Sequence, residues 1–136
     1  MAAKIVFLLL VVICQALAVE ERQEPDLKVR YISNPLIGRA LSIPKRLEDT
    51  QVNCHATYPD GVMYEVYPNA RHPNLDKGLG MVGPSISFKD CSIIIRNAGT
   101  EASGTYQLMS TVRRSTDSAM VVTRQNFIVE VVVQST

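Results

Sequence analysis

The side chains that could do nucleophilic or metal chemistry are few in this chain. Its cysteines are Cys14, Cys54 and Cys91, and its histidines are His55 and His72. A cysteine beside a histidine can act as an activated nucleophile, and four clustered ligands of these types can bind zinc. In an extended strand, neighbouring side chains point to opposite faces, so Cys54 and His55 cannot form a catalytic pair. No group of these residues has zinc-site spacing.

Glycine and acidic residues give catalysis no better support. Residues 78–83, Gly-Leu-Gly-Met-Val-Gly, match the Gly-x-Gly-x-x-Gly pattern of a phosphate-binding turn. That turn requires a following helix, whereas Pro84 and a short alternating segment follow here, so we interpret the glycines as a loop. Acidic residues are scattered singly, without the clustering of a calcium loop or a carboxylate pair. We expect no enzyme activity, no cofactor and no metal; a secreted hydrolase would need His72 beside a serine and a carboxylate.

The N-terminus has the pattern of a cleaved secretory signal. Lys4 precedes an apolar run from Ile5 to Cys14, and Ala-Leu-Ala follows at 16–18. The run is about half the roughly 20 apolar residues that a membrane-spanning helix needs. We predict that residues 1–18 are a signal peptide, that the rest is secreted to the extracellular space, and that it carries no membrane anchor.

Removal of this signal changes the charge and the cysteine count. The full chain has 14 basic and 13 acidic residues, so loss of Lys4 leaves a formally neutral chain. Without a basic cluster there is no electrostatic footprint for nucleic acid or an anionic membrane. Cys54 and Cys91 remain, and in a secreted chain two cysteines most simply form one disulfide. Two buried free thiols or an intermolecular bond are the alternatives.

The segments that would position the cysteines and the other candidate residues are predicted to be short β-strands. Residues 19–26 are charged, and we expect a flexible lead-in there. Beyond them, apolar and polar residues alternate with the strand period of two. The alternating segments are 27–31, 41–43, 52–56, 62–66, 86–88, 91–95, 106–112 and 127–133, with a weaker strand expected at 79–82 and a hairpin extension at 120–123. Their number and spacing predict a single all-β sandwich domain over residues 27–136.

Residues 91–108 carry the most specific pattern. The strand Ser92-Ile-Ile-Ile-Arg-Asn-Ala98 is followed by Ala102-Ser-Gly-Thr-Tyr106. This order resembles the corner between strands E and F of immunoglobulin-superfamily domains, most closely the variable or intermediate type. The resemblance extends from about Leu27 to Val133, with Val52-Asn-Cys54 matching the strand of the first core cysteine. It implies an immunoglobulin-like antiparallel β-sandwich of about seven to nine strands.

The chain departs from this family at three core positions. Leu108 stands where the second core cysteine is expected, and Ala102 replaces the corner aspartate. The chain has no tryptophan, and Tyr64 is the best candidate for its place. Gly104 and Tyr106 are retained, and the resemblance implies that the Tyr106 hydroxyl bonds to backbone a few residues upstream.

The resemblance also implies where a disulfide would lie. Cys54 and Cys91 are both expected to face the core, on strands that are neighbours in one sheet of this family. A bond between them would then lie within that sheet. It would offset part of the roughly 2–5 kcal/mol that loss of a native disulfide costs.

Recognition is the function that the resemblance implies, and loops are its usual location. We expect the Tyr58–Gly61 turn and the Arg113–Gln125 connection to lie at one end of the sandwich. Tyr58, Arg113 and Arg114 are types favoured at interface hot spots, although ordinary surface roles are the alternative.

The last strand offers a second candidate surface. Its outward face has Ile128 and Val132 on either side of Glu130, which makes it more apolar than a solvated face usually is. The resemblance implies a dimerisation face here, with the N-terminal segment as an alternative cover. We therefore predict a secreted, single-domain recognition protein whose partner is an unknown extracellular protein, a cell-surface ligand or a second copy of the chain. The alternative function is a carrier of a small apolar ligand.

Overall fold

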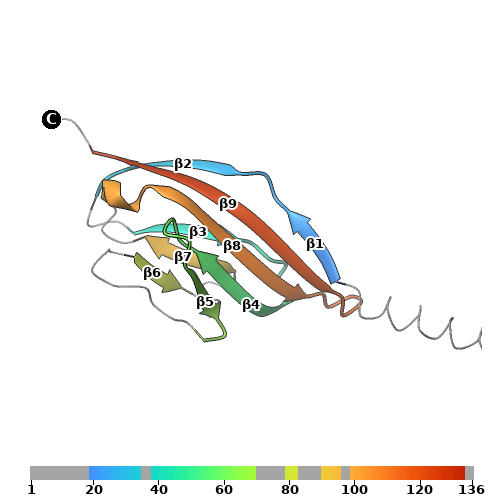
Figure 1. Cartoon of the computed structure of the whole chain (residues 1–136). Helices are drawn as coiled ribbons and strands as arrows, with labels where there is room; N and C mark the ends of the chain where they lie inside the picture. Colours follow the sequence, from blue (N-terminus) through green and yellow to red (C-terminus); the bar gives the residue numbers. More distant parts are fainter. Residues whose placement is uncertain (1–18, 35–37, 70–78, 83–89, 96–98, 134–136) are drawn as a thin grey trace, which may run out of the picture.

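The computed structural model describes residues 19–34, 38–69, 79–82, 90–95 and 99–133 (Figure 1). The predicted signal peptide, the predicted strand around Ile86–Phe88 and His72 lie outside these ranges. The described residues form two β-sheets that enclose one apolar core.

The larger sheet has the strand order β1-β9-β8-β4-β5, with β2 also paired to β9. Its strands are β1 (Val19–Gln23), β2 (Leu27–Ile32), β4 (Thr50–Thr57), β5 (Met63–Tyr67), β8 (Gly104–Arg113) and β9 (Met120–Val132). The smaller sheet has the order β3-β7-β6, from β3 (Arg39–Ile43), β6 (Leu79–Val82) and β7 (Cys91–Ile95). The predicted all-β sandwich is confirmed, including the edge strand at 79–82 and the hairpin that β9 begins at Met120.

The N-terminal segment forms two strands, although its charged composition predicts a flexible start. Val19–Gln23 pairs in parallel with the first residues of β9, and Leu27–Ile32 pairs in parallel with its last residues. The prediction of a flexible lead-in over 19–26 is therefore wrong for β1. The unpaired backbone edge of β9 supplies hydrogen-bond partners that do not depend on side-chain polarity, so an edge strand can form from charged residues.

The disulfide between Cys54 and Cys91 is present, with Cα atoms 5.5 Å apart. Its predicted location within one sheet is wrong, because Cys54 lies on β4 of the larger sheet and Cys91 on β7 of the smaller one. β7 instead lies between β3 and β6, and Leu41 of β3 is paired with Ile93. The bond therefore ties the two sheets together across the core, and both cysteines are fully buried.

Cys54 thus lies one strand later in the fold than the resemblance implied, and this shift also corrects the position of Tyr64. The core tryptophan of variable-type domains belongs to strand C, packed against the disulfide between strands B and F. Here the corresponding strand is β4, which carries Cys54, whereas Tyr64 lies on the edge strand β5 and is only half-buried. Tyr64 packs against the core but does not take the tryptophan's place.

The corner before β8 has the predicted geometry. The short 3-10 turn η2 (Thr100–Ala102) precedes β8, and the Tyr106 hydroxyl donates a hydrogen bond of 2.6 Å to the Ala102 carbonyl. Leu108 is fully buried and fills its core position with hydrocarbon. Gly104 has φ +143°, and a Cβ there would lie 2.7 Å from the Pro59 Cβ. The corner thus depends on glycine and on the buried tyrosine together.

Candidate functional site

Tyr58 does not lie with Arg113 and Arg114 as predicted. Strands β4 and β8 are antiparallel, with Thr50 opposite Arg113 and Thr57 opposite Gln107. Tyr58 follows the far end of β4, so it and the arginines lie at opposite ends of the sandwich. The prediction assumed the strand assignment that the disulfide also corrects.

Tyr58 is part of the core. Only 3% of it is exposed, and its ring packs edge-on against Tyr64 at 5.3 Å and Tyr106 at 5.7 Å between centroids. Burial, together with the neighbouring tyrosines, raises the pKa of its hydroxyl well above the ordinary value. A side chain this enclosed is not available to a partner at the surface.

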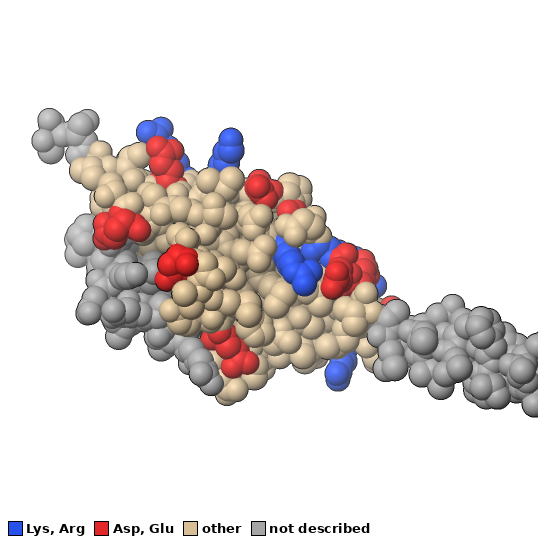
Figure 2. All heavy atoms as spheres, viewed as in Figure 1, with Lys and Arg blue, Asp and Glu red and all other residues tan. Residues whose placement is uncertain are grey.

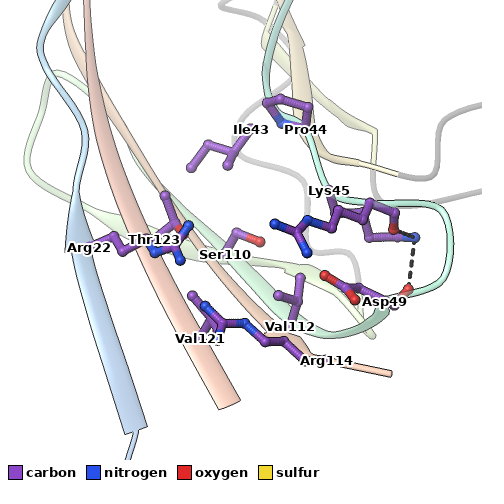
Figure 3. Close-up of a pocket in the computed structure, with 11 residues that line it drawn as sticks. Arg22, Ile43, Pro44, Lys45, Asp49, Ser110, Val112, Arg114, Val121 and Thr123 are labelled. Atoms are coloured by element: carbon purple, nitrogen blue, oxygen red, sulfur yellow. Dashed lines mark hydrogen bonds between the residues drawn. The ribbon is translucent and has the colours of Figure 1, made fainter. Parts of the chain in front are cut away.

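At the other end of the sandwich, the strands and the β3–β4 turn enclose a cleft of about 160 Å³ (Figure 3). Its apolar and hydroxyl-bearing wall comes from β3, β8 and β9. Its charged rim comes from β1, the β3–β4 turn and the end of β8. The lining residues are Arg22, Ile43, Pro44, Lys45, Arg46, Asp49, Ser110, Val112, Arg114, Val121 and Thr123.

Polar contacts fix part of this rim. Lys45 Nζ donates to the Asp49 carbonyl at 3.0 Å, as the dashed line in Figure 3 marks, and to the Arg46 carbonyl at 3.2 Å. Asp49 Oδ1 accepts a 3.4 Å bond from the Ser115 amide, which connects the β3–β4 turn to the β8–β9 hairpin. The turn and the hairpin are therefore held against each other across the mouth of the cleft.

Glu20 connects two arginines on the other side of the rim. It accepts a hydrogen bond from Arg22 Nε at 2.8 Å and pairs with the Arg114 guanidinium. The bond from Arg22 is the chief reason that the pKa of the Glu20 carboxyl is lowered, and the charges of Arg114 and Arg22 add to it. Arg114 also lies 4.0 Å from Asp117.

Of the residues that line this cleft, only Arg114 is among the binding residues predicted from the sequence. Lys45 and Arg46 lie in the β3–β4 turn, outside the loops predicted to bind, and Arg22 lies in the segment expected to be flexible. A short Pro-Lys-Arg sequence at 44–46 was the available signal, but it reaches the same cleft as β1 only because the two sheets pack together. Arg113 is exposed and belongs to the same end of β8 without lining the cleft.

The outward face of β9 lies where it was predicted. Its residues stand beside those of β2, with Ile128 opposite Lys28, Glu130 opposite Arg30, and Val132 opposite Ile32. We call these six residues the β2–β9 face. Ile32 is 53% exposed and Ile128 37%. β2 pairs with the backbone edge of β9 and leaves this face uncovered. Figure 2 shows basic and acidic side chains dispersed among uncharged residues over the surface in view.

In the part of the chain that the structure describes, no side chains are grouped for metal binding or for catalysis by a cysteine thiol. Both core cysteines are in the disulfide and supply no thiol. Within the described ranges, no group of three or more His, Cys, Asp or Glu residues could hold a metal ion. Nor do those ranges contain a helix long and apolar enough to cross a membrane.

Solved structures with a similar fold include murine CRIg and Tim-1. The likeness to murine CRIg has a TM-score of 0.55 at 14% sequence identity and covers 79% of this chain and 93% of that one. The likeness to Tim-1 has a TM-score of 0.53 at 14% identity and covers 83% and 97%. No family model and no curated protein matches the sequence. The fold is thus that of a variable-type immunoglobulin-like domain, as the resemblance predicted.

Proposed function

We propose that this chain is a secreted recognition domain that binds a protein partner outside the cell through the β2–β9 face. The observation that carries the proposal is the exposed apolar pair Ile32 and Ile128 on an uncovered sheet face. The variable-type fold supports recognition as the class of function. The disulfide supports an oxidising compartment, because such bonds persist mainly outside the cytosol.

The composition of the β2–β9 face suits a protein partner. Ile32 and Ile128 lie on either side of the charged neighbours Arg30 and Glu130, so the face combines exposed apolar side chains with charges of both signs. Protein interfaces commonly combine apolar and polar surface in this way. The charges would set orientation, and the isoleucines would supply the area removed from water.

The carrier alternative draws little support from the described residues. The core positions between the sheets are filled, with Leu108, Ile93 and Ile95 fully buried. The cleft at the end of the sandwich holds about 160 Å³ and has a charged rim. Sites for small apolar ligands are usually about 300–1,000 Å³ and mostly apolar.

The test compares capture by three versions of the processed, secreted chain. Wild type, Ile128→Glu and Met63→Glu are immobilised and exposed to extracellular fluid, and sedimentation of each measures self-association. Met63 is the matched control because it is 58% exposed on β5, at the opposite edge of the same sheet. Both substitutions place one carboxylate on an exposed apolar position, so an effect of charge alone would appear in both.

We expect one protein, or a second copy of the chain, to bind wild type and Met63→Glu with equal affinity. Binding to Ile128→Glu should be at least about tenfold weaker, because one buried charge without a partner costs more than 1.4 kcal/mol. Equal binding by Ile128→Glu and wild type would remove the β2–β9 face from the proposal. Recovery of the chain only inside the producing cells would contradict secretion.

A further inference from the structure

The cleft at the β3–β4 turn has an excess of positive charge. Its lining contains four cationic side chains and one carboxylate, and among the described residues Glu20 and Asp117 are two further carboxylates paired to that rim. Cations therefore outnumber carboxylates four to three. The four cations are Arg22, Lys45, Arg46 and Arg114. Gathering like charges around a hollow is unfavourable unless an anion enters it, because their mutual repulsion is less screened there than on an open surface.

The cations differ in how far the protein already neutralises them. Arg22 and Arg114 share Glu20. Lys45 donates to two backbone carbonyls, which orient its ammonium without cancelling its charge. Arg46 lines the cleft, is exposed, and has no ion pair among the described residues. Arg46 is therefore the cation with most freedom to bind an incoming anion.

The wall of the cleft supplies an oriented neutral donor as well. Ser110 is 3% exposed, and its Oγ accepts a 2.8 Å hydrogen bond from Gln51 Nε2. Because that contact occupies the oxygen as an acceptor, the hydroxyl proton is left to donate elsewhere. Figure 3 shows the Ser110 hydroxyl among the cleft residues, with Arg22 on the β1 side and Lys45 on the side of the turn. Cationic side chains and a neutral hydroxyl thus line the same small cleft.

We propose that this cleft binds an oxyanion, a carboxylate or a phosphate or sulfate group, carried by the partner of the domain. Guanidinium groups bind such oxygens through charge-assisted hydrogen bonds, and a buried hydroxyl adds a directed donor. The statement that the oxyanion belongs to the partner rests on the proposed function, whereas binding of the oxyanion to the cleft does not. The cleft lies beside Arg22 and Thr123, toward the start of β9, whereas the β2–β9 face lies toward its end.

The test is an NMR titration of the isotope-labelled, disulfide-intact secreted chain at constant ionic strength. The probes are N-acetylglutamate, inorganic phosphate and the neutral N-acetylglutamine. We expect saturable shifts of the backbone amides of Ser110 and Thr123 with at least one of the two anions, and none with N-acetylglutamine. Tighter binding of N-acetylglutamate would identify a protein carboxylate as the ligand, and tighter binding of phosphate a phosphate- or sulfate-bearing one.

Three variants make the assignment specific. Arg46→Gln should raise the dissociation constant about tenfold, as expected for loss of one charged hydrogen-bond partner. Ser110→Ala should weaken binding severalfold without changing the net charge. Arg30→Gln removes the same charge from the β2–β9 face and should leave the constant within about twofold.

The proposal is overturned if the shifts do not saturate, if N-acetylglutamine causes the same shifts, or if Arg30→Gln weakens binding as much as Arg46→Gln. Since no partner protein enters this titration, its failure is distinguishable from failure of capture through the β2–β9 face.

Discussion

Tyr106→Phe tests the corner that identifies the fold. The side chain is 1% exposed, and its hydroxyl donates to the Ala102 carbonyl at 2.6 Å. The substitution keeps the ring and its edge-on contact with Tyr58 while removing that bond. It therefore isolates one buried hydrogen bond from the packing around it.

The expected loss in the free energy of unfolding near neutral pH is about 1–2 kcal/mol. A net intramolecular hydrogen bond contributes roughly 0.5–1.5 kcal/mol, and leaving a buried carbonyl without its donor adds to the cost. Removal of one oxygen creates only a small void, so a loss far above this range would indicate repacking of the core.

The same hydroxyl predicts a dependence on alkaline pH. Burial, together with the neighbouring Tyr31, raises the pKa of Tyr106 from 10.0 to about 12. Because the folded pKa is the higher one, the hydroxyl's contribution is complete below pH 10 and is lost as the pH rises toward 12. The stability difference between wild type and Tyr106→Phe should shrink by about 1.4 kcal/mol between pH 8 and pH 11.

The assay is urea unfolding of both proteins at pH 7, 8, 9, 10 and 11, with the disulfide intact. The raised pKa of Tyr58 affects both proteins, so it largely cancels from their difference. A loss below about 0.5 kcal/mol at pH 7, the lower end for one hydrogen bond, would refute the role of the hydroxyl. A difference that stays constant up to pH 11 would refute its burial in the folded state.

Three further changes test the fold. Cys54→Ala/Cys91→Ala opens a loop whose ends are 37 residues apart and should cost about 4 kcal/mol in urea unfolding; reduced wild type, which keeps both sulfur atoms, should lose a similar amount. Gly104→Ala forces alanine to φ +143° against Pro59 and should cost about 1–3 kcal/mol, so an unchanged midpoint of thermal unfolding would contradict this geometry. Ser103→Ala removes the 2.9 Å acceptor of a β9 backbone amide and should cost about 1 kcal/mol, with Ser115→Ala as an exposed control.

The features predicted correctly from the sequence depend on contacts between residues close together in the chain, or on the two-residue alternation of side chains along a strand. Tyr106 reaches a carbonyl four residues upstream, so its role follows from a local pattern. Cys91, Ile93 and Ile95 share a buried face because successive side chains in a strand alternate. The outward position of Ile128 follows from the same rule.

The features predicted wrongly depend on pairing between distant segments. The short alternating segment at 41–43 is part of β3 and lies beside β7, where the sequence-based assignment placed the strand of Cys54. That offset moved Cys54 to the other sheet and separated Tyr58 from Arg113. The cationic cleft could not be predicted from sequence because Arg22 and Arg46 meet Ser110 only through the parallel pairing of β1 and the antiparallel pairing of β4 with β8.

The central structural claim is that the sheets are joined covalently by Cys54 and Cys91, while the hydrocarbon of Leu108 fills its own core position. Mass spectrometry of the non-reduced, proteolysed secreted chain tests this directly. We predict one linked pair of peptides that contain Cys54 and Cys91, and no alkylation of either cysteine before reduction. Alkylation of both cysteines without reduction, or linkage between two copies of the chain, would contradict the claim.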